Sequence, residues 1–318
     1  MTTDKKDRKT RLTVLVALGA NLLIAAAKGI AGVLAGSPAL LSEAAHSVAD
    51  SMNEVFLLAA LRRSRRPADQ RHPFGYGKER YFWSLLAAVG IFVMGGCFSF
   101  LQGIDALRSH EQESTSGYVI GLSVLGVALV AEGGSLLRAL HQVRGQRGGI
   151  GSDPALRTVV AEDGTAVLGV LLAAGGMALH MVTGEAVWEA SASIAIGLLL
   201  VYVAYRLGKD ARDQLIGEAV DPELSDDIRA MLDEQPEIDQ VASLLTMRLG
   251  LDSTLIAARI DLKPGLDSED VELVSERIKA AVVEAWPEAD QVFLDITDAR
   301  TSPAHRPGAT EARHPGAR

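Results

Sequence analysis

Hydrophobic residues are concentrated in the first two-thirds of the chain, in runs long enough to cross a membrane. A helix needs about 20 mostly apolar residues to span the hydrocarbon core of a bilayer. Six segments approach that length, at residues 12–36, 39–61, 81–107, 117–140, 156–182 and 186–207. The pattern therefore predicts an α-helical membrane domain with six spans over residues 12–208. The first run is too long for the apolar core of a cleavable signal peptide, so we expect the chain to keep its N-terminus.

Beyond residue 208 the pattern changes to that of a small soluble domain. It predicts a helix, two strands, a second helix and a third strand, at residues 222–234, 241–249, 254–262, 268–285 and 292–296. The second helix opens with acidic residues, which suit the positive end of a helix dipole. This order predicts an α+β domain over residues 209–300 with one layer of sheet and one of helices, as in a ferredoxin-like fold. Residues 301–318 lack apolar periodicity, and we expect this tail to be disordered.

Along the chain, connections rich in basic residues alternate with connections that contain none. They gather in the arm before the first span and in two later links, at residues 1–11, 62–80 and 144–157. The three links between these contain neither Lys nor Arg, at residues 37–38, 109–116 and 183–185. By the positive-inside rule, both termini face the cytoplasm. We therefore expect a multi-pass protein of the plasma or bacterial inner membrane with a basic cytoplasmic arm at residues 1–11.

Charge and cysteine content narrow the possible partners. Residues 209–300 contain 9 Lys and Arg against 23 Asp and Glu, a balance of −14. Such an acidic domain argues against nucleic acid as a partner. The chain has one cysteine, Cys97, which excludes an intramolecular disulfide.

The second apolar segment contains several ionisable residues, and two of them, His46 and Asp50, are four residues apart. Residues four apart share one face of a helix, so the imidazole and the carboxylate can grip one divalent cation. An ionisable group at membrane depth costs about 2.5–3.5 kcal/mol on insertion scales, and such groups usually mark an ion or proton path. The alternative interpretation is a polar pair that joins neighbouring helices.

The best complement to this pair is Glu162-Asp163, near the start of the fifth span. A tetrahedral ion such as Zn²⁺ takes about four ligands. Adjacent residues on a helix point about 100° apart, so we expect one of these two carboxylates to meet His46 and Asp50. We favour Asp163, with Glu162 or a water as the fourth ligand. The alternative is an acid that only interacts with the dipole at the helix N-terminus.

The link between the second and third spans contains a second candidate site, Asp69 with His72. Glycines at 75 and 77 allow the chain to turn tightly there. A purely structural loop is an equally good interpretation of this segment.

Two motifs together resemble those of the cation diffusion facilitator family. They are His46-Ser47-x-x-Asp50 with Asn53, and the run from His72 to Lys78, HPFGYGK. The resemblance covers residues 12–298 and implies six spans, cytoplasmic termini and a homodimer. It also implies export of Zn²⁺ or a related divalent ion in exchange for protons. By resemblance, His46 and Asp50 are transport-site ligands.

Three positions depart from the family pattern. A second ligand four residues before Asp163 is common in the family, but Val159 stands there. In the loop site, where Asp69 and His72 match, Tyr76 stands in place of the usual second histidine. The predicted soluble domain has no histidine, whereas many relatives bind regulatory zinc there. We therefore expect this domain to dimerise without binding a transition metal tightly.

These observations predict a transporter rather than an enzyme, with no cofactor other than the transported ion. An imidazole ligand favours Zn²⁺, and Fe²⁺, Mn²⁺, Co²⁺ and Cd²⁺ remain as alternatives. The sequence contains neither a Walker motif nor H-E-x-x-H, so neither ATP hydrolysis nor a zinc-protease site is indicated. An intramembrane metalloenzyme and a metal-free membrane scaffold are the rival classes.

Overall fold

The computed structural model describes residues 2–108, 115–144, 154–250 and 252–297. It divides into two compact units. The first comprises residues 1–62 and 79–212, and the second comprises residues 63–78 and 213–318. The predicted tail, residues 301–318, lies outside the described residues.

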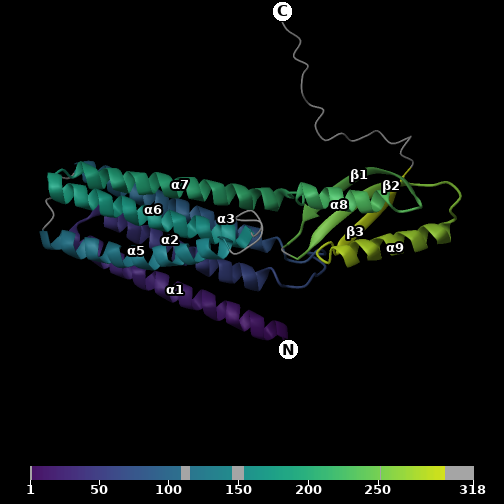
Figure 1. Ribbon diagram of the computed structural model, residues 1–318, viewed down its shortest axis with the longest axis horizontal. Helices are drawn as coiled ribbons and strands as arrows, with labels where there is room; N and C mark the ends of the chain where they lie inside the picture. Colours follow the sequence, from purple (N-terminus) through teal and green to yellow (C-terminus); the bar gives the residue numbers. More distant parts are fainter. Residues whose placement is uncertain (1, 109–114, 145–153, 251, 298–318) are drawn as a thin grey trace, which may run out of the picture. The chain divides into compact units, whose positions relative to one another are not determined.

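The first unit is a helical bundle (Figure 1). Its elements are α1 (Thr2–Ala35), α2 (Pro38–Arg63), α3 (Glu79–Gly90), the π-helix η1 (Ile91–Cys97), α4 (Phe98–Arg108), α5 (Thr115–Arg144), α6 (Pro154–Thr183) and α7 (Val187–Ile216). The run α3–η1–α4 is one continuous span, and each of the six predicted spans corresponds to a helix or to this run. Within the described residues, five helical stretches are long and apolar enough to cross a membrane. The remaining predicted span, α2, is not among these five. It has 26 residues, long enough to cross a membrane, but it carries three acidic side chains.

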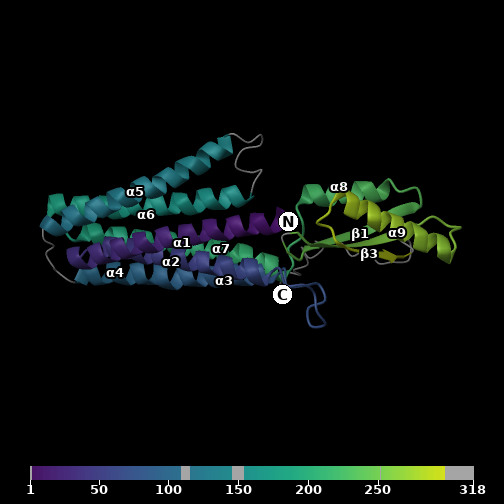
Figure 2. The same cartoon turned by 90° about the horizontal axis from the view of Figure 1, so that it is seen from below.

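Small residues let the helices of the bundle approach closely. A Cβ atom on Gly96 would lie 2.9 Å from Cγ2 of Val201, and one on Gly197 would lie 3.0 Å from the carbonyl oxygen of Gly96. The η1 segment and α7 are thus nearly in backbone contact, as is typical of membrane helices packed through glycine. Elsewhere in the bundle α5 packs along α6 and against α1 (Figure 2).

The second unit contains the predicted order of helix, strand, strand, helix and strand. It contains α8 (Pro222–Asp233), β1 (Ile238–Arg248), β2 (Thr254–Leu262), α9 (Ser268–Ala285) and β3 (Gln291–Ile296). The sheet order is β1-β2-β3, with β1 and β2 antiparallel and β2 and β3 parallel. The predicted fold class, a six-span helical domain with a small α+β domain, is confirmed. Strand β1 begins three residues before the predicted start. The prediction missed these residues because register shifts between Ile238 and Ser243 interrupt the alternation by which a strand is recognised.

Alternating residues of β2 separate the two faces of the sheet. Ile256, Ala258 and Ile260 are buried beneath α8 and α9. On the other face Leu245, Ala257 and Phe293 align across the three strands. Leu245 is 62% exposed and Phe293 51% exposed, so we call this row the apolar sheet row.

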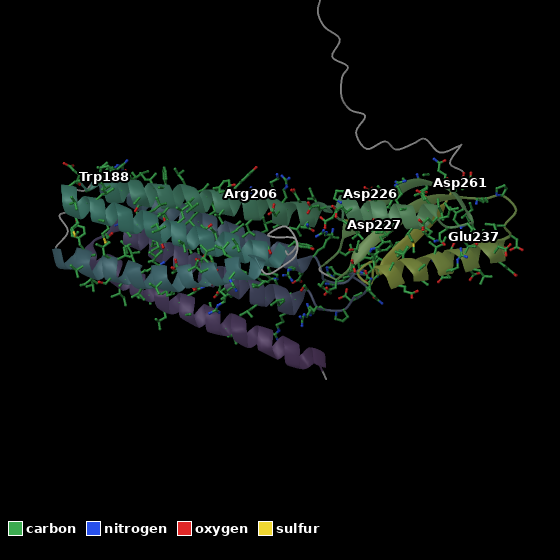
Figure 3. All side chains as sticks on the ribbon, in the orientation of Figure 1. Trp188, Arg206, Asp226, Asp227, Glu237 and Asp261 are labelled. Atoms are coloured by element: carbon green, nitrogen blue, oxygen red, sulfur yellow. The ribbon has the colours of Figure 1, made fainter. Side chains whose placement is uncertain are left out.

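Several acidic side chains lie at the surface of the second unit. Asp226 and Asp227 on α8, with Glu237 and Asp261, are among those seen in Figure 3. Arg277 bonds Glu237 at 2.5 Å and holds the pKa of that carboxyl below its usual value.

The connection between α2 and α3, residues 63–78, packs on the second unit. A Cβ on Gly77 would lie 2.3 Å from the carbonyl oxygen of Leu249, so only glycine fits at this contact. The rings of Phe74 and Phe293 meet edge-on with centroids 6.5 Å apart. These contacts explain why residues 63–78 group with the second unit, whereas the sequence alone suggested a link within the membrane domain.

Candidate metal-binding site

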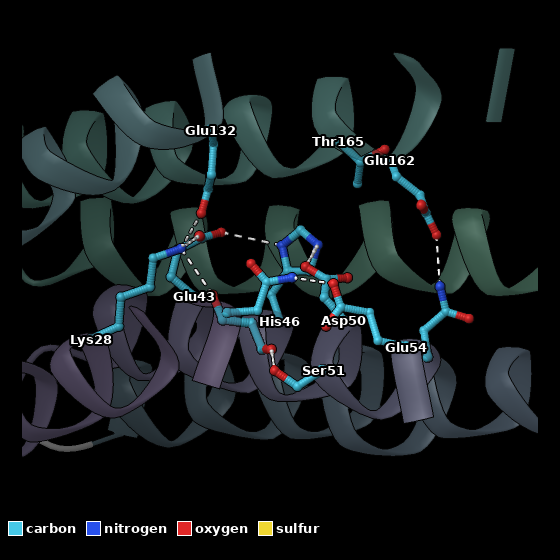
Figure 4. A network of polar contacts seen from close by, with 12 residues as sticks. Lys28, Glu43, His46, Asp50, Ser51, Glu54, Glu132, Glu162 and Thr165 are labelled. Carbon is cyan, nitrogen blue, oxygen red and sulfur yellow. Dashed lines mark hydrogen bonds and ion pairs between the residues drawn. The ribbon is translucent and has the colours of Figure 1, made fainter. Parts of the chain in front are cut away.

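His46 and Asp50 lie together on one face of α2, as their spacing predicts. His46 Nε2 is 3.4 Å from Asp50 Oδ2 (Figure 4). Asp50 stands at the middle of the 26-residue helix, the level furthest from both of its ends. The His46 side chain is 5% exposed and that of Asp50 37% exposed. The pair thus offers one nitrogen and one oxygen ligand, with the carboxylate on the more open side.

A second carboxylate, Glu43, faces the other nitrogen of His46. Its Oε1 lies 3.6 Å from His46 Nδ1, too far for a hydrogen bond but close enough to orient the ring electrostatically. Gly169 on α6 makes room for this contact, since a Cβ there would lie 2.2 Å from Glu43 Oε1 and 3.3 Å from His46 Nδ1. A metal-ligating histidine usually directs its second nitrogen to a carboxylate or carbonyl. The arrangement favours Nε2, beside Asp50, as the nitrogen that would bind an ion.

A buried lysine connects this site to two further helices. Lys28 Nζ on α1 lies 2.9 Å from Glu43 Oε2, 2.9 Å from Glu132 Oε1 on α5 and 3.1 Å from Ser47 Oγ on α2. Lys28 is 1% exposed and Glu43 0% exposed. We call Lys28, Glu43, Glu132 and Ser47 the lysine cluster. Figure 4 shows Glu43 between Lys28 and His46, so the cluster holds the Glu43 carboxylate in place on the Nδ1 side of the imidazole.

The two acids of α6 point to different neighbours. Glu162 Oε1 accepts a hydrogen bond of 2.7 Å from Asn53 Nδ2 on α2, and Asp163 Oδ2 accepts one of 2.8 Å from Ser135 Oγ on α5. Their divergence follows the 100° step between adjacent helix residues. Glu162 is thus the one that reaches the helix of His46 and Asp50.

The described residues do not form a closed metal cage in this structure. Among them, no three His, Cys, Asp or Glu side chains gather closely enough to hold one ion. The structure therefore brings His46 and Asp50 together and leaves Glu162 and Asp163 apart from them. Closing the site around an ion requires α6 to move relative to α2, or water to complete the ligand set.

The loop residues Asp69 and His72 also lie together, at the surface of the second unit. Asp69 Oδ1 accepts hydrogen bonds from the backbone N–H groups of Arg71 (2.9 Å) and His72 (2.8 Å), and Oδ2 accepts one of 2.6 Å from the Tyr76 hydroxyl. Tyr76 accordingly holds the pKa of Asp69 below its ordinary value, helped by the backbone of His72. His72 Nδ1 is 3.5 Å from Asp69 Oδ1, and its ring packs on Tyr76. The bonds that order this turn already use both carboxylate oxygens, which leaves a weak site for a cation.

Comparison with known proteins agrees with this architecture. The family model described as the cation efflux transmembrane domain matches residues 14–216. The chain belongs to the cation diffusion facilitator family of metal transporters. The family match covers α2, with His46 and Asp50, and α6, with Glu162 and Asp163. Members of this family carry metal cations and are not enzymes.

Relatives of this chain occur in distantly related organisms. The chain is 31% identical over 282 residues to the mitochondrial proton-coupled zinc antiporter SLC30A9 of Xenopus laevis, covering 84% of this chain and 50% of the relative. It is 32% identical to metal tolerance protein C4 of Arabidopsis thaliana, covering 80% and 58%. It is 23% identical to the manganese efflux system protein MneP of Bacillus subtilis, covering 92% and 97%. The chain thus spans about half the length of the animal relatives, and nearly the whole length of the bacterial one.

The sequence pattern alone does not relate Lys28, Glu43 and Glu132 to one another. The structure joins them into one cluster next to His46. A usable signal was the position of Glu43, three residues before His46, which places both side chains on one helix face. Lys28 lies 15 residues from Glu43 and 104 residues from Glu132 in the sequence, too far apart for any local pattern to relate them.

Proposed function

We propose that this protein exports divalent cations, Zn²⁺ first among them, from the cytoplasm in exchange for protons. We further propose that it works as a homodimer in the cell membrane with both termini in the cytoplasm. The observation that carries the proposal is the His46–Asp50 pair at the middle of α2, an imidazole and a carboxylate 3.4 Å apart in a helix long enough to span a membrane. Ionisable groups are energetically costly within a membrane, and they usually mark the path of an ion or a proton.

The exchange follows from the chemistry of the ligands. His46 Nε2 and the Asp50 carboxylate bind a cation only when neither carries a proton, so metal and protons compete for the same lone pairs. Asp163 is the proposed third ligand, and Glu162 is the alternative that its hydrogen bond to Asn53 favours. Glu43 orients the ring of His46. Alternating exposure of this set to the two sides of the membrane then exchanges one cation for protons without a covalent intermediate.

Zinc is the first choice because of the imidazole, a ligand that suits Zn²⁺ better than it suits harder ions. The names of the animal relatives, proton-coupled zinc antiporters, support the same choice. Manganese is the second candidate. The carboxylates Asp50, Glu162 and Asp163 outnumber the one histidine, and Mn²⁺ prefers oxygen ligands. A manganese efflux protein also matches this chain over 97% of its own length.

The homodimer proposal rests on the second unit. Its apolar sheet row, Leu245, Ala257 and Phe293, lies on the face opposite the core that packs against the helices. An exposed apolar row on an acidic domain is a favourable place for a second copy, since it contributes contact area away from most of the like charges. Salt should strengthen this contact by screening the acidic charge.

The test is metal uptake into proteoliposomes loaded with a metal-sensitive dye, with a proton gradient directed from the lumen to the outside. We expect Zn²⁺ uptake that depends on the gradient and acidification of the medium as lumenal protons leave. Asp50→Ala should abolish it, whereas Asp239→Asn, a charge removal in the second unit, should leave it unchanged. Uptake by Asp50→Ala at the wild-type rate would refute the site. Adding Mn²⁺ as a competitor decides between the ions: Zn²⁺ is excluded as the preferred ion if equimolar Mn²⁺ suppresses its uptake more than tenfold.

A further inference from the structure

A cavity separate from the site just described lies at the end of the bundle where α2 begins. It has a volume of about 300 Å³. Pro38 at the start of α2, Gln102 and Asp105 on α4, His180 on α6 and Glu189 on α7 are among its lining residues. A water occupies about 30 Å³ in the liquid, so the cavity has room for a cation with a shell of water. At about 1.5 Å per residue, its Pro38 edge lies roughly 12 Å along α2 from His46.

One wall of this cavity holds a histidine that is already oriented. His180 is 7% exposed, and its Nδ1 lies 3.0 Å from Glu189 Oε1. Glu189 is 1% exposed, and its second oxygen accepts a hydrogen bond from the Ser37 hydroxyl. A carboxylate only accepts hydrogen bonds, so the shared proton belongs to Nδ1, and in the neutral ring the lone pair lies on Nε2. The ring of Tyr118 meets that of His180 edge-on at 5.5 Å and fixes its plane.

The free nitrogen of His180 has no use in a purely structural pair. Within the described residues, no group donates a hydrogen bond to Nε2. A helix-end explanation covers part of the arrangement, since the last turn of a helix favours a basic residue type and the first turn an acidic one, and His180 and Glu189 occupy those turns of α6 and α7. That explanation accounts for neither the unpaired nitrogen nor the cavity beside it. A histidine whose other nitrogen is held by a buried carboxylate is the usual form of a metal-ligating histidine.

We propose that this cavity is a second binding site for a divalent cation, with His180 Nε2 as its nitrogen ligand. Glu189 is a positioning residue that holds the tautomer, and Asp105 supplies negative charge from the wall formed by α4. With two protein groups the site is open, so water completes the shell and the ion is held weakly. Its role in transport rests on the proposed function: an ion that leaves His46 and Asp50 towards this end stops here before release. Binding itself does not depend on that role.

The test counts bound Zn²⁺ by calorimetry on the full-length protein in detergent, in an Asp50→Ala background that removes the first site. We expect His180→Gln to lose one weakly bound ion per chain relative to His141→Gln, a matched change on α5. Glu189→Gln should weaken the same ion at least tenfold, because an amide can donate to Nδ1 and transfer the ring proton to Nε2. A purely structural pair would instead lower the melting temperature with no change in ion count.

Asp105→Asn is a second test that does not depend on whether the His180→Gln protein folds. It leaves the His180–Glu189 pair in place and should still weaken binding of the ion. Equal ion counts for the His180→Gln and His141→Gln proteins would overturn the proposal. If His180→Gln does not fold, unchanged affinity in Asp105→Asn would overturn it. Uptake by wild-type proteoliposomes is measured in parallel. Failure of that uptake refutes transport, whereas the ion count alone decides the second site.

Discussion

Replacing Lys28 by methionine tests the lysine cluster most directly. Met keeps much of the length of the side chain and removes the ammonium that Glu43 and Glu132 share, each at 2.9 Å. Glu43 is 0% exposed and the Glu132 side chain 15% exposed, so neither carboxylate can turn to bulk water. Breaking a buried ion pair from one side costs about 3–5 kcal/mol. At about 2–4 °C per kcal/mol for a domain of this size, we expect the melting temperature to fall by roughly 6–20 °C.

Companion variants separate charge from packing. Lys28→Arg keeps the charge and should lose less than Lys28→Met. Adding Glu43→Gln and Glu132→Gln to Lys28→Met makes the cluster neutral and should restore most of the stability, because a neutral replacement for a buried ion pair is often well tolerated. The assay is a thermal melt of the purified protein in detergent followed by intrinsic fluorescence. A Lys28→Met protein that melts within about 2 °C of wild type, on the same scale, would show that the cluster is not a buried ionic contact.

Three further outcomes concern the proposed transport site and the second unit. Asp50→Ala should reduce Zn²⁺ uptake to background while its melting curve stays near that of wild type, because the carboxylate is partly exposed; loss of fold along with uptake would contradict this assignment. Asp163→Ala should lose uptake and Glu162→Ala should retain most of it; the reverse result would show that the helix register is shifted by one residue. An isolated fragment covering residues 209–300 should dimerise more tightly as salt rises and bind no Zn²⁺ with sub-micromolar affinity; calorimetry and sedimentation measure both, and either a salt-independent monomer or tight zinc binding would contradict the expectation.

The spans and the β2 and α9 elements were predictable because their signals are local. Long apolar runs identify membrane helices, and the short, mostly apolar run from Thr254 to Leu262, which directly follows a turn segment beginning at Gly250, identifies a strand. The π-helix at Ile91–Cys97 was not predictable, since one wider turn within an apolar run changes no residue type. The start of β1 was hidden by its register shifts.

The same distinction between local and distant signals applies to the residues of the candidate site. His46 and Asp50 meet because they are four residues apart on one helix, which a sequence displays directly. The contacts from Lys28 to Glu132 and from Asp163 to Ser135 join different helices, and they depend on how those helices pack. Spacing along the chain holds no information about such pairs. The same limit applies to Glu162, whose partner Asn53 is 109 residues away.

The packing of residues 63–78 on the second unit changes how the two units are joined. The chain crosses between them at three places, after α2, before α3 and within α7. The second unit is therefore built from separate stretches of the chain, and the loop that carries Asp69 and His72 is one of them. A larger side chain at position 77 would disturb the contact with Leu249 and so weaken the fold of the second unit, although this position lies between two membrane spans in the sequence.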